Sequence, residues 1–236
     1  MKSILRGFVA ILLTFWAYSV QAQQSCQAEV FTPDAVPKNP VVASPNGRFL
    51  ITLGGYCDSE NYEGGWLRVT ERQRTLAQYG LRDLSAGIYI KWAPDSRAFY
   101  LMWDDGGNLG RYHLRVFHVL NSSVREVRAT NLALADFHRR HYCEARGDNV
   151  YAVRWLEHPR ELLVATEIYE TGDCGKAMGF ITGYAVDTLD GRILRRYSTE
   201  EIKKEMRLCP SAFWPNSAWE QSDVEKAKAE LPKNDN

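Results

Sequence analysis

The sequence lacks the short motifs that mark several common enzyme classes. It has no Gly-x-Ser-x-Gly nucleophile elbow, no Walker phosphate loop and no Gly-x-Gly-x-x-Gly fingerprint. None of the five cysteines belongs to a Cys-x-x-Cys pair, which excludes thioredoxin-like redox chemistry and the usual zinc ribbons. These absences make an enzyme the less favoured class of protein.

The chain also lacks an excess of charge of either sign. It contains 29 basic and 29 acidic residues. Removal of the first 22 residues would take away Lys2 and Arg6 and leave a formal charge of about −2. This balance gives no support for a nucleic acid as partner.

Long apolar runs are missing except at the N-terminus. Lys2 and Arg6 precede an apolar stretch over residues 8–20, which ends in a small-x-small pattern at Ala22. This order predicts a cleavable signal peptide and export to the periplasm. The alternative is a membrane anchor, but the stretch is interrupted by polar residues and is shorter than the roughly twenty residues needed to cross a bilayer. We therefore expect no membrane span in the mature chain.

A short phrase occurs three times, each time between two apolar runs. It reads Ala-Ser-Pro-Asn-Gly-Arg at residues 43–48, Trp-Ala-Pro-Asp-Ser-Arg at residues 92–97 and Trp-Leu-Glu-His-Pro-Arg at residues 155–160. The phrase has the composition of a tight turn. A strand repeat of this length cannot bury its apolar faces alone, so the sequence predicts three units that stack on one another.

Each unit is predicted to contain four antiparallel strands, because short apolar runs alternate with polar turns. An inserted helix is expected over residues 131–146, ending at Gly147, and the capping boxes 198–201 and 222–225 predict two C-terminal helices. The expected strands cover residues 41–43, 49–53, 66–70 and 75–79 in the first unit, 88–92, 98–103, 111–120 and 124–129 in the second, and 150–155, 161–168, 180–186 and 192–197 in the third.

A first strand ending in Trp, a Pro-Asp turn with a following basic residue and then an apolar strand resemble the blades of TolB-type and WD40-like β-propellers. The resemblance covers about residues 41–198 and is strongest at 92–97 and 44–48, whereas residues 157–159 depart from the turn consensus. It implies an all-β fold of about three four-stranded antiparallel propeller-like blades. The alternative fold is a β-sandwich.

Three blades are fewer than the four to eight that typically close a propeller ring. The resemblance therefore implies an open or incomplete propeller, a fourth sheet assembled from the lead-in and the segment after Ser198, or a ring completed by a homodimer. The domains expected are a signal peptide (1–22), an extended lead-in (23–40), the propeller-like β domain (41–198) and a C-terminal helical segment with a tail (199–236).

Strand direction places the long connections of every unit at one end and the tight turns at the other. The long connections carry acidic and aromatic residues, which suit a binding face on a rigid scaffold. The alternative is that these residue types occur there because they suit solvent-exposed turns, without a role in binding. The candidate binding residues are Tyr56, Asp58, Glu60, Glu63, Trp66, Asp104, Asp105, Glu170 and Asp173.

Three cysteines fall at the same end, and an odd number of cysteines in an oxidising compartment allows two disulfide bonds. We expect Cys143–Cys174 to pin the inserted helix to its unit and Cys26–Cys57 to fix the lead-in. Cys209 is then the candidate for the unpaired thiol.

Two patterns in the sequence suggest a metal site, but we do not expect either of them to bind a metal. His138 and His141 share a helix face near Cys143, but an oxidised cysteine cannot be a thiolate ligand. Residues 104–108 offer oxygen donors without the alternating spacing of a calcium loop. We expect no metal and no cofactor.

The sequence thus favours an exported periplasmic module that presents an acidic and aromatic loop face to a protein partner, in the manner of an immunity or inhibitor protein. The alternative from another class is a cell-envelope hydrolase that uses loop carboxylates. Its chemistry would require two of these carboxyl groups to lie at a set separation. A scaffold component of an envelope complex is the third.

Overall fold

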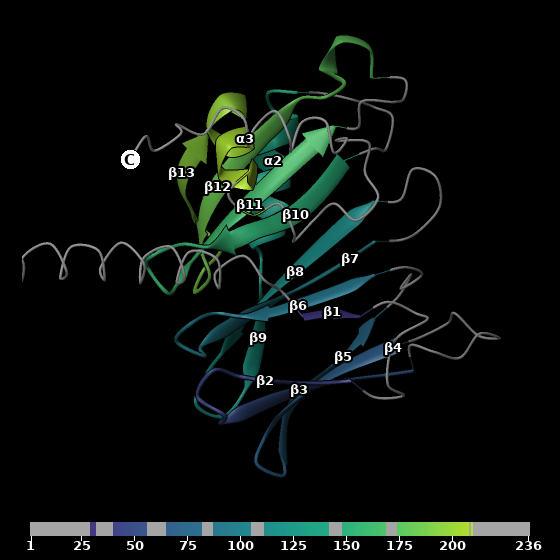
Figure 1. The fold of residues 1–236 in the computed structure, drawn as a ribbon, viewed down its shortest axis with the longest axis vertical. Helices are drawn as coiled ribbons and strands as arrows, with labels where there is room; N and C mark the ends of the chain where they lie inside the picture. The colour runs from purple at the N-terminus through teal and green to yellow at the C-terminus, as the bar shows by residue number, and fades with distance from the viewer. Residues whose placement is uncertain are drawn as a thin grey trace, which may run out of the picture.

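Strands dominate the folded part of the chain. The computed structural model describes residues 29–31, 40–55, 65–81, 87–104, 111–141, 148–168, 174–207 and 209. These residues form three antiparallel sheets that are stacked along the long axis of the molecule, and within them no sheet closes into a barrel (Figure 1). The predicted all-β fold with three four-stranded antiparallel units is confirmed at this level, whereas a two-sheet sandwich does not describe a stack of three.

The strand order in each sheet follows the chain. The first sheet contains β2 (Val41–Ala43), β3 (Phe49–Gly54), β4 (Gly65–Glu71) and β5 (Arg74–Leu81). The middle sheet contains β6 (Ile88–Trp92), β7 (Ala98–Asp104), β8 (Tyr112–Val119) and β9 (Val124–Val127). The third sheet contains β10 (Asp148–Trp155), β11 (Glu161–Ile168), β12 (Ile181–Asp187) and β13 (Ile193–Tyr197).

The repeat found in the sequence is present in the strand register. When the three turn phrases are superimposed without gaps, Phe49, Ala98 and Glu161 become equivalent. Their cross-strand partners are Glu71, His118 and Asp187, respectively, at equivalent points of the three sheets. The three units therefore share the pairing register of their second and third strands.

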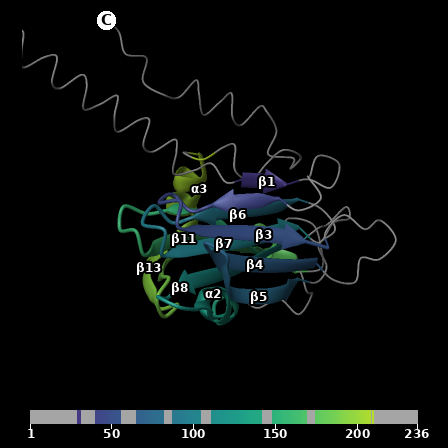
Figure 2. The same ribbon diagram turned by 90° about the horizontal axis from the view of Figure 1, so that it is seen from below.

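Two apolar cores join the three sheets. Phe99 and Leu101 of β7 belong to the core shared with the first sheet, whereas Tyr100 and Met102 belong to the core shared with the third sheet. Because both faces of the middle sheet are buried, β7 reads as an almost continuous apolar run rather than an alternating one. Figure 2 looks onto the first sheet and shows it lying over the strands of the middle sheet.

The described part of the lead-in joins the middle sheet. β1 (Glu29–Phe31) pairs antiparallel with β6 and extends that sheet to five strands. The segment after Ser198 forms a helix that packs on the third sheet. In the described residues, the lead-in and this segment do not combine into a fourth sheet.

The inserted helix is shorter than the sequence predicted. Helix α2 covers Ala129–His138 rather than residues 131–146, and Gly147 lies outside the described residues. Ala129, Ala133 and Phe137 form its buried stripe, one turn apart. The next position on that stripe would fall at Arg140 or His141, so burial gives no reason for the helix to continue.

The second helix begins at the predicted capping box. Helix α3 covers Thr199–Arg207. The backbone N–H of Ser198 donates to Glu201 Oε2 (2.8 Å), and the backbone N–H of Glu201 donates to Ser198 Oγ (3.2 Å). This reciprocal pair satisfies two backbone donors at the helix start. A 3₁₀ turn, η2 (Gly175–Ala177), precedes β12.

Candidate functional site

The repeated phrase forms the tight turns β2–β3, β6–β7 and β10–β11, and the first two of these turns contact one another. The backbone N–H of Asn46 donates to Ser96 Oγ (3.1 Å), which joins the turns of the first and middle sheets. The Arg125 guanidinium donates to the carbonyl oxygen of Leu189 in the last turn of the third sheet. These bonds tie the three sheets together at one end, which we call the turn end.

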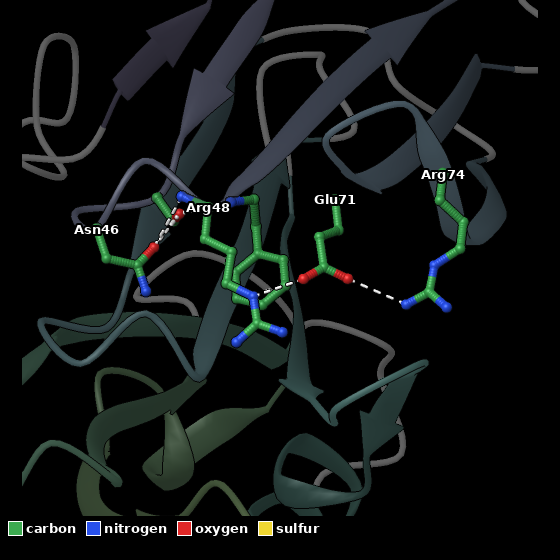
Figure 3. Close-up of polar contacts among 6 residues, drawn as sticks. Asn46, Arg48, Glu71 and Arg74 are labelled. Carbon is green, nitrogen blue, oxygen red and sulfur yellow. Dashed lines mark hydrogen bonds and ion pairs between the residues drawn. The ribbon is translucent and has the colours of Figure 1, made fainter.

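Ion pairs reinforce the turn end in the first sheet. Arg48 Nε lies 2.6 Å from Glu71 Oε1, and Arg74 Nη2 lies 3.0 Å from Glu71 Oε2, so the carboxylate bridges two arginines (Figure 3). The backbone N–H of Arg48 also donates to Asn46 Oδ1 (3.0 Å). The hydrogen bond from Arg48 is the main reason why the pKa of Glu71 lies below its usual value.

The third sheet repeats this ion pair at the equivalent register position. Arg160 Nη2 lies 2.7 Å from Asp187 Oδ2. Burial acts to raise the pKa of Asp187, but hydrogen bonds from the Leu189 backbone N–H and from Arg160 outweigh it and lower the pKa.

The middle sheet has His118 where the other two sheets have an acid. His118 is only 6% exposed, and its Nδ1 has no hydrogen-bond partner in the described part of the chain. Burial lowers the pKa of His118, and the charges of Arg125 and Arg160 lower it further, against a smaller opposite effect of Asp95 and Asp187. The surroundings of His118 in the middle sheet therefore favour the neutral imidazole over the charged form.

The long connections leave from the opposite end, which we call the loop end. In the first sheet β3 ends and β4 begins there, with Gly54 opposite Trp66. In the middle sheet Asp104, the last residue of β7, lies opposite Tyr112. Of the candidate binding residues, Trp66 and Asp104 are the two that the structure describes. The rest lie outside the described residues: Tyr56, Asp58, Glu60, Glu63, Asp105, Glu170 and Asp173.

Trp66 is held in place by its own sheet. Its indole ring covers Gly54, where a Cβ atom would lie only 2.1 Å from the ring. The Arg68 guanidinium stacks on the indole with its central carbon 4.5 Å from the ring centroid. Trp66 is therefore a partly exposed aromatic side chain with a fixed position at the loop end.

Asp104 lies beside a row of tyrosines that runs from the middle sheet to the third sheet. Burial raises the pKa of Tyr89, as does the charge of Asp104, and a hydrogen bond with Tyr112 partly offsets this. The Tyr112 ring packs edge-on against Tyr151, with ring centroids 6.1 Å apart. The Tyr151 hydroxyl donates to Glu167 Oε2 at 2.7 Å.

Glu167 was not identified from the sequence as a candidate site residue. Glu167 belongs to β11 and is only 6% exposed, although its side chain is ionisable. A signal was present, since it is the one charged residue in the apolar run 162–168. The tyrosine row thus connects two carboxylates, Asp104 and Glu167, that come from neighbouring sheets.

The two histidines of the inserted segment have separate structural roles. His138 pairs with Asp148 at the start of β10. His141 follows the helix and stacks on Phe180, with ring centroids 4.5 Å apart. Among the residues that the structure describes, no cluster of three His, Cys, Asp or Glu side chains could hold a metal ion.

The described cysteines correct one expectation. Cys174 and Cys209 are both disulfide-bonded. The prediction that Cys209 keeps a free thiol is therefore wrong. Cys26, Cys57 and Cys143 lie outside the described residues, so the partners of Cys174 and Cys209 are not assigned. Because Cys209 must pair with one of the other four cysteines, the predicted pairs Cys143–Cys174 and Cys26–Cys57 do not both form.

The strongest electrostatic cluster surrounds Asp136 on α2, whose side chain is 2% exposed. Arg196 of β13 donates to both of its carboxylate oxygens at 2.7 Å, and Arg139 donates to Oδ1 at 2.7 Å. Arg140 Nε lies 3.4 Å from Oδ2. The Arg196 bonds are the largest reason why the pKa of Asp136 lies far below its usual range.

Comparisons with known proteins do not place this arrangement in a family. No family model, no curated protein and no solved structure matches the chain. Neither described helix has the length and apolar composition needed to span a membrane.

Proposed function

We propose that the chain is an exported periplasmic binding module, made of propeller-like blades, that presents its loop end to a protein partner. The sharper form of the proposal is an immunity or inhibitor protein that neutralises an exported toxin. Export depends on the predicted signal peptide, which lies outside the described residues.

The observation that carries the proposal is that the long connections leave from one end of a stack that is held together at both ends. Inter-sheet hydrogen bonds join Asn46 to Ser96 at the turn end and Tyr112 to Asn149 at the loop end. The long connections of the sheets start from the loop end, where Trp66 is fixed by Gly54 and Arg68. Loops on a rigid scaffold are common binding sites, and fixed Trp and Arg side chains are frequent hot spots of protein interfaces.

A capture experiment with the mature chain tests this proposal. The wild-type protein is expected to recover one dominant partner from a periplasmic extract. Recovery should be lost on charge reversal of Glu60, Glu63 and Asp173, and reduced by Trp66→Ala. Glu157→Lys, an exposed change at the turn end, is the matched control and should leave recovery unchanged. A partner that is retained by the loop-end variants and lost with Glu157→Lys would reverse the assignment.

A second candidate function is hydrolysis of a cell-envelope polymer. The observation in its favour is the row of tyrosines between Asp104 and Glu167, because paired carboxyl groups are the requirement for glycosidase chemistry. Activity against envelope polymers that disappears in both Asp104→Asn and Glu167→Gln, with unchanged thermal unfolding, would favour this function. An inactive wild-type protein would remove it.

A further inference from the structure

A shallow groove of about 360 Å³ lies between α2 and β13 at the edge of the third sheet. The helix and the strand run side by side here, since Gly191 packs against the start of α2 and Arg196 binds Asp136, two residues before the helix ends. The helix residues that line the groove are spaced i, i+3 and i+7 and so share one side of α2. The lining residues are Leu132, Ala135, Arg139, Asp190, Arg192 and Ile193.

The groove has an exposed apolar side chain on its helix wall. Leu132 is 42% exposed, Ile193 on the opposite wall is partly exposed, and Leu194, the next residue of β13, is 41% exposed. Met178 and Phe180 are also exposed, but they precede β12 and so lie at the other end of that strand from Asp190 and Arg192. Val41 of the first sheet and Leu120 of the middle sheet are the other large exposed apolar residues in the described ranges. Grouped exposed apolar residues mark interaction surfaces better than scattered ones.

The charge around the groove is positive. Three arginines share the single buried carboxylate of Asp136, so the cluster carries an excess of two positive charges. Arg139 belongs to this cluster and to the groove, and its side chain is 71% exposed. On the opposite wall Asp190 accepts the backbone N–H of Arg192 and keeps its negative charge, so the groove lining itself has two arginines against one carboxylate. Arginine guanidinium groups favour partner carboxylates, with which they form two-pronged hydrogen bonds.

We propose that the α2–β13 groove docks an acidic segment of a partner protein that also carries aliphatic side chains. Aliphatic side chains of the segment contact Leu132 and Ile193, and its carboxylates pair with Arg139 and Arg192. This surface is distinct from the loop end, so the inference goes beyond the proposed function. Charge complementarity selects a partner segment over a second copy of this chain, since a second copy would bring its own arginines to the groove.

A synthetic peptide provides a defined probe for the groove. The test uses dye-labelled Glu-Leu-Glu-Glu-Leu-Leu-Glu-amide, with two control peptides in which Lys replaces Glu or Ser replaces Leu. Fluorescence anisotropy with the mature, disulfide-intact protein should show saturable binding of the acidic–aliphatic peptide only. Arg139→Glu combined with Arg192→Glu should weaken binding by about tenfold or more. Arg97→Glu, another exposed arginine, is the control and should change nothing.

Leu132→Asn keeps every arginine and should also weaken binding, which separates the groove from a general effect of charge. No saturable binding of the peptide, or equal binding by the Lys or Ser peptide, would overturn the proposal. So would a dimer that Leu132→Glu dissociates, or a photoreactive residue at position 132 that crosslinks within the chain to residues 210–236. If the wild-type protein binds the peptide but recovers no partner in the capture experiment, the result counts against the proposed function alone.

Discussion

The first and third sheets have the same strand order and the same register, but different structures cover their outer faces. In the third sheet, α3 packs against Gly183 of β12, whereas α2 lies on the inner side of the sheet, where it also contacts β8 of the middle sheet. In the first sheet, the outer face carries polar cross-strand neighbours such as Arg68 and Gln78, which are joined by a hydrogen bond of 3.0 Å. One face packed on a core and one polar face is the usual arrangement of an antiparallel sheet at the edge of a stack.

This difference shows how one repeat can be stabilised in two ways. In the third sheet the carboxylates of Asp136 and Asp187 are buried, although their arginine partners reach solvent, so a neutral replacement leaves a buried polar group without its charge-assisted hydrogen bonds. Interactions of the outer face and turn end of the first sheet are largely exposed, where ion pairs contribute little. Substitutions at equivalent places should therefore have larger effects in the third sheet.

The largest effect is expected for Asp136→Asn. The substitution replaces a 2% exposed carboxylate that accepts charge-assisted hydrogen bonds from Arg139 and Arg196, and should lower the free energy of unfolding by about 2 kcal/mol. Urea denaturation at pH 7 measures the loss. Because the pKa of Asp136 is lowered in the fold, its contribution is complete above its ordinary pKa of 3.8 and is lost as the pH falls further. A loss no larger than that of an exposed acid such as Glu157 would break the comparison.

The next largest difference in stability is expected between alanine substitutions of one glycine in the third sheet and one in the first. In Gly183→Ala the new Cβ would lie 2.6 Å from Ile202 Cδ1 and 3.0 Å from Tyr197 Cβ, so α3 must shift, at a cost of about 1–2 kcal/mol. In Gly80→Ala of the first sheet, the new Cβ meets no atom within 4 Å, and stability should stay the same or rise slightly. Denaturation midpoints of both variants make the measurement.

The cause of the Gly183→Ala effect can be isolated with a second substitution. Ile202→Val removes the Cδ1 atom that the new Cβ would meet. The loss of unfolding free energy in the double variant should therefore be smaller than the sum of the losses in the two single variants. Strict additivity would show that the contact with α3 is not the source of the loss.

In the middle sheet, His118 makes the stability of the protein depend on pH. The pKa of His118 is lowered in the fold, so the neutral form contributes stability that is present above its unfolded value of 6.5 and is lost as the pH falls through the folded value. Thermal unfolding between pH 7.5 and pH 5 should show this loss in the wild-type protein. A His118→Phe variant should flatten the profile, and a profile unaltered by the substitution would assign the pH dependence to other groups.

The sequence was a good guide where local chemistry decides the structure. The turn phrase and the alternation of apolar residues placed β2, β6 and β11 with their observed bounds, and the capping box placed α3. These signals depend on neighbouring residues, so they can be read without the fold.

Features that depend on distant residues were not accessible in the same way. The end of α2 follows from the burial of Phe137 against the third sheet. The oxidised state of Cys209 depends on a cysteine brought near by the fold, and the role of Glu167 depends on Tyr151 in another strand. The binding residues expected on the long connections stay predictions apart from the positions of Trp66 and Asp104.

The smallest effect is expected for Glu71→Gln at the turn end of the first sheet. The carboxylate pairs with Arg48 and Arg74, but both arginine side chains are more than half exposed, and water can replace the lost bonds. The denaturation midpoint should stay within the range of ordinary surface substitutions. Asp187→Asn, the equivalent change in the third sheet, should exceed it, since Asp187 is buried and also accepts the Leu189 backbone N–H. Equal losses would mean that the register of the repeat, and not burial, sets the strength of these ion pairs.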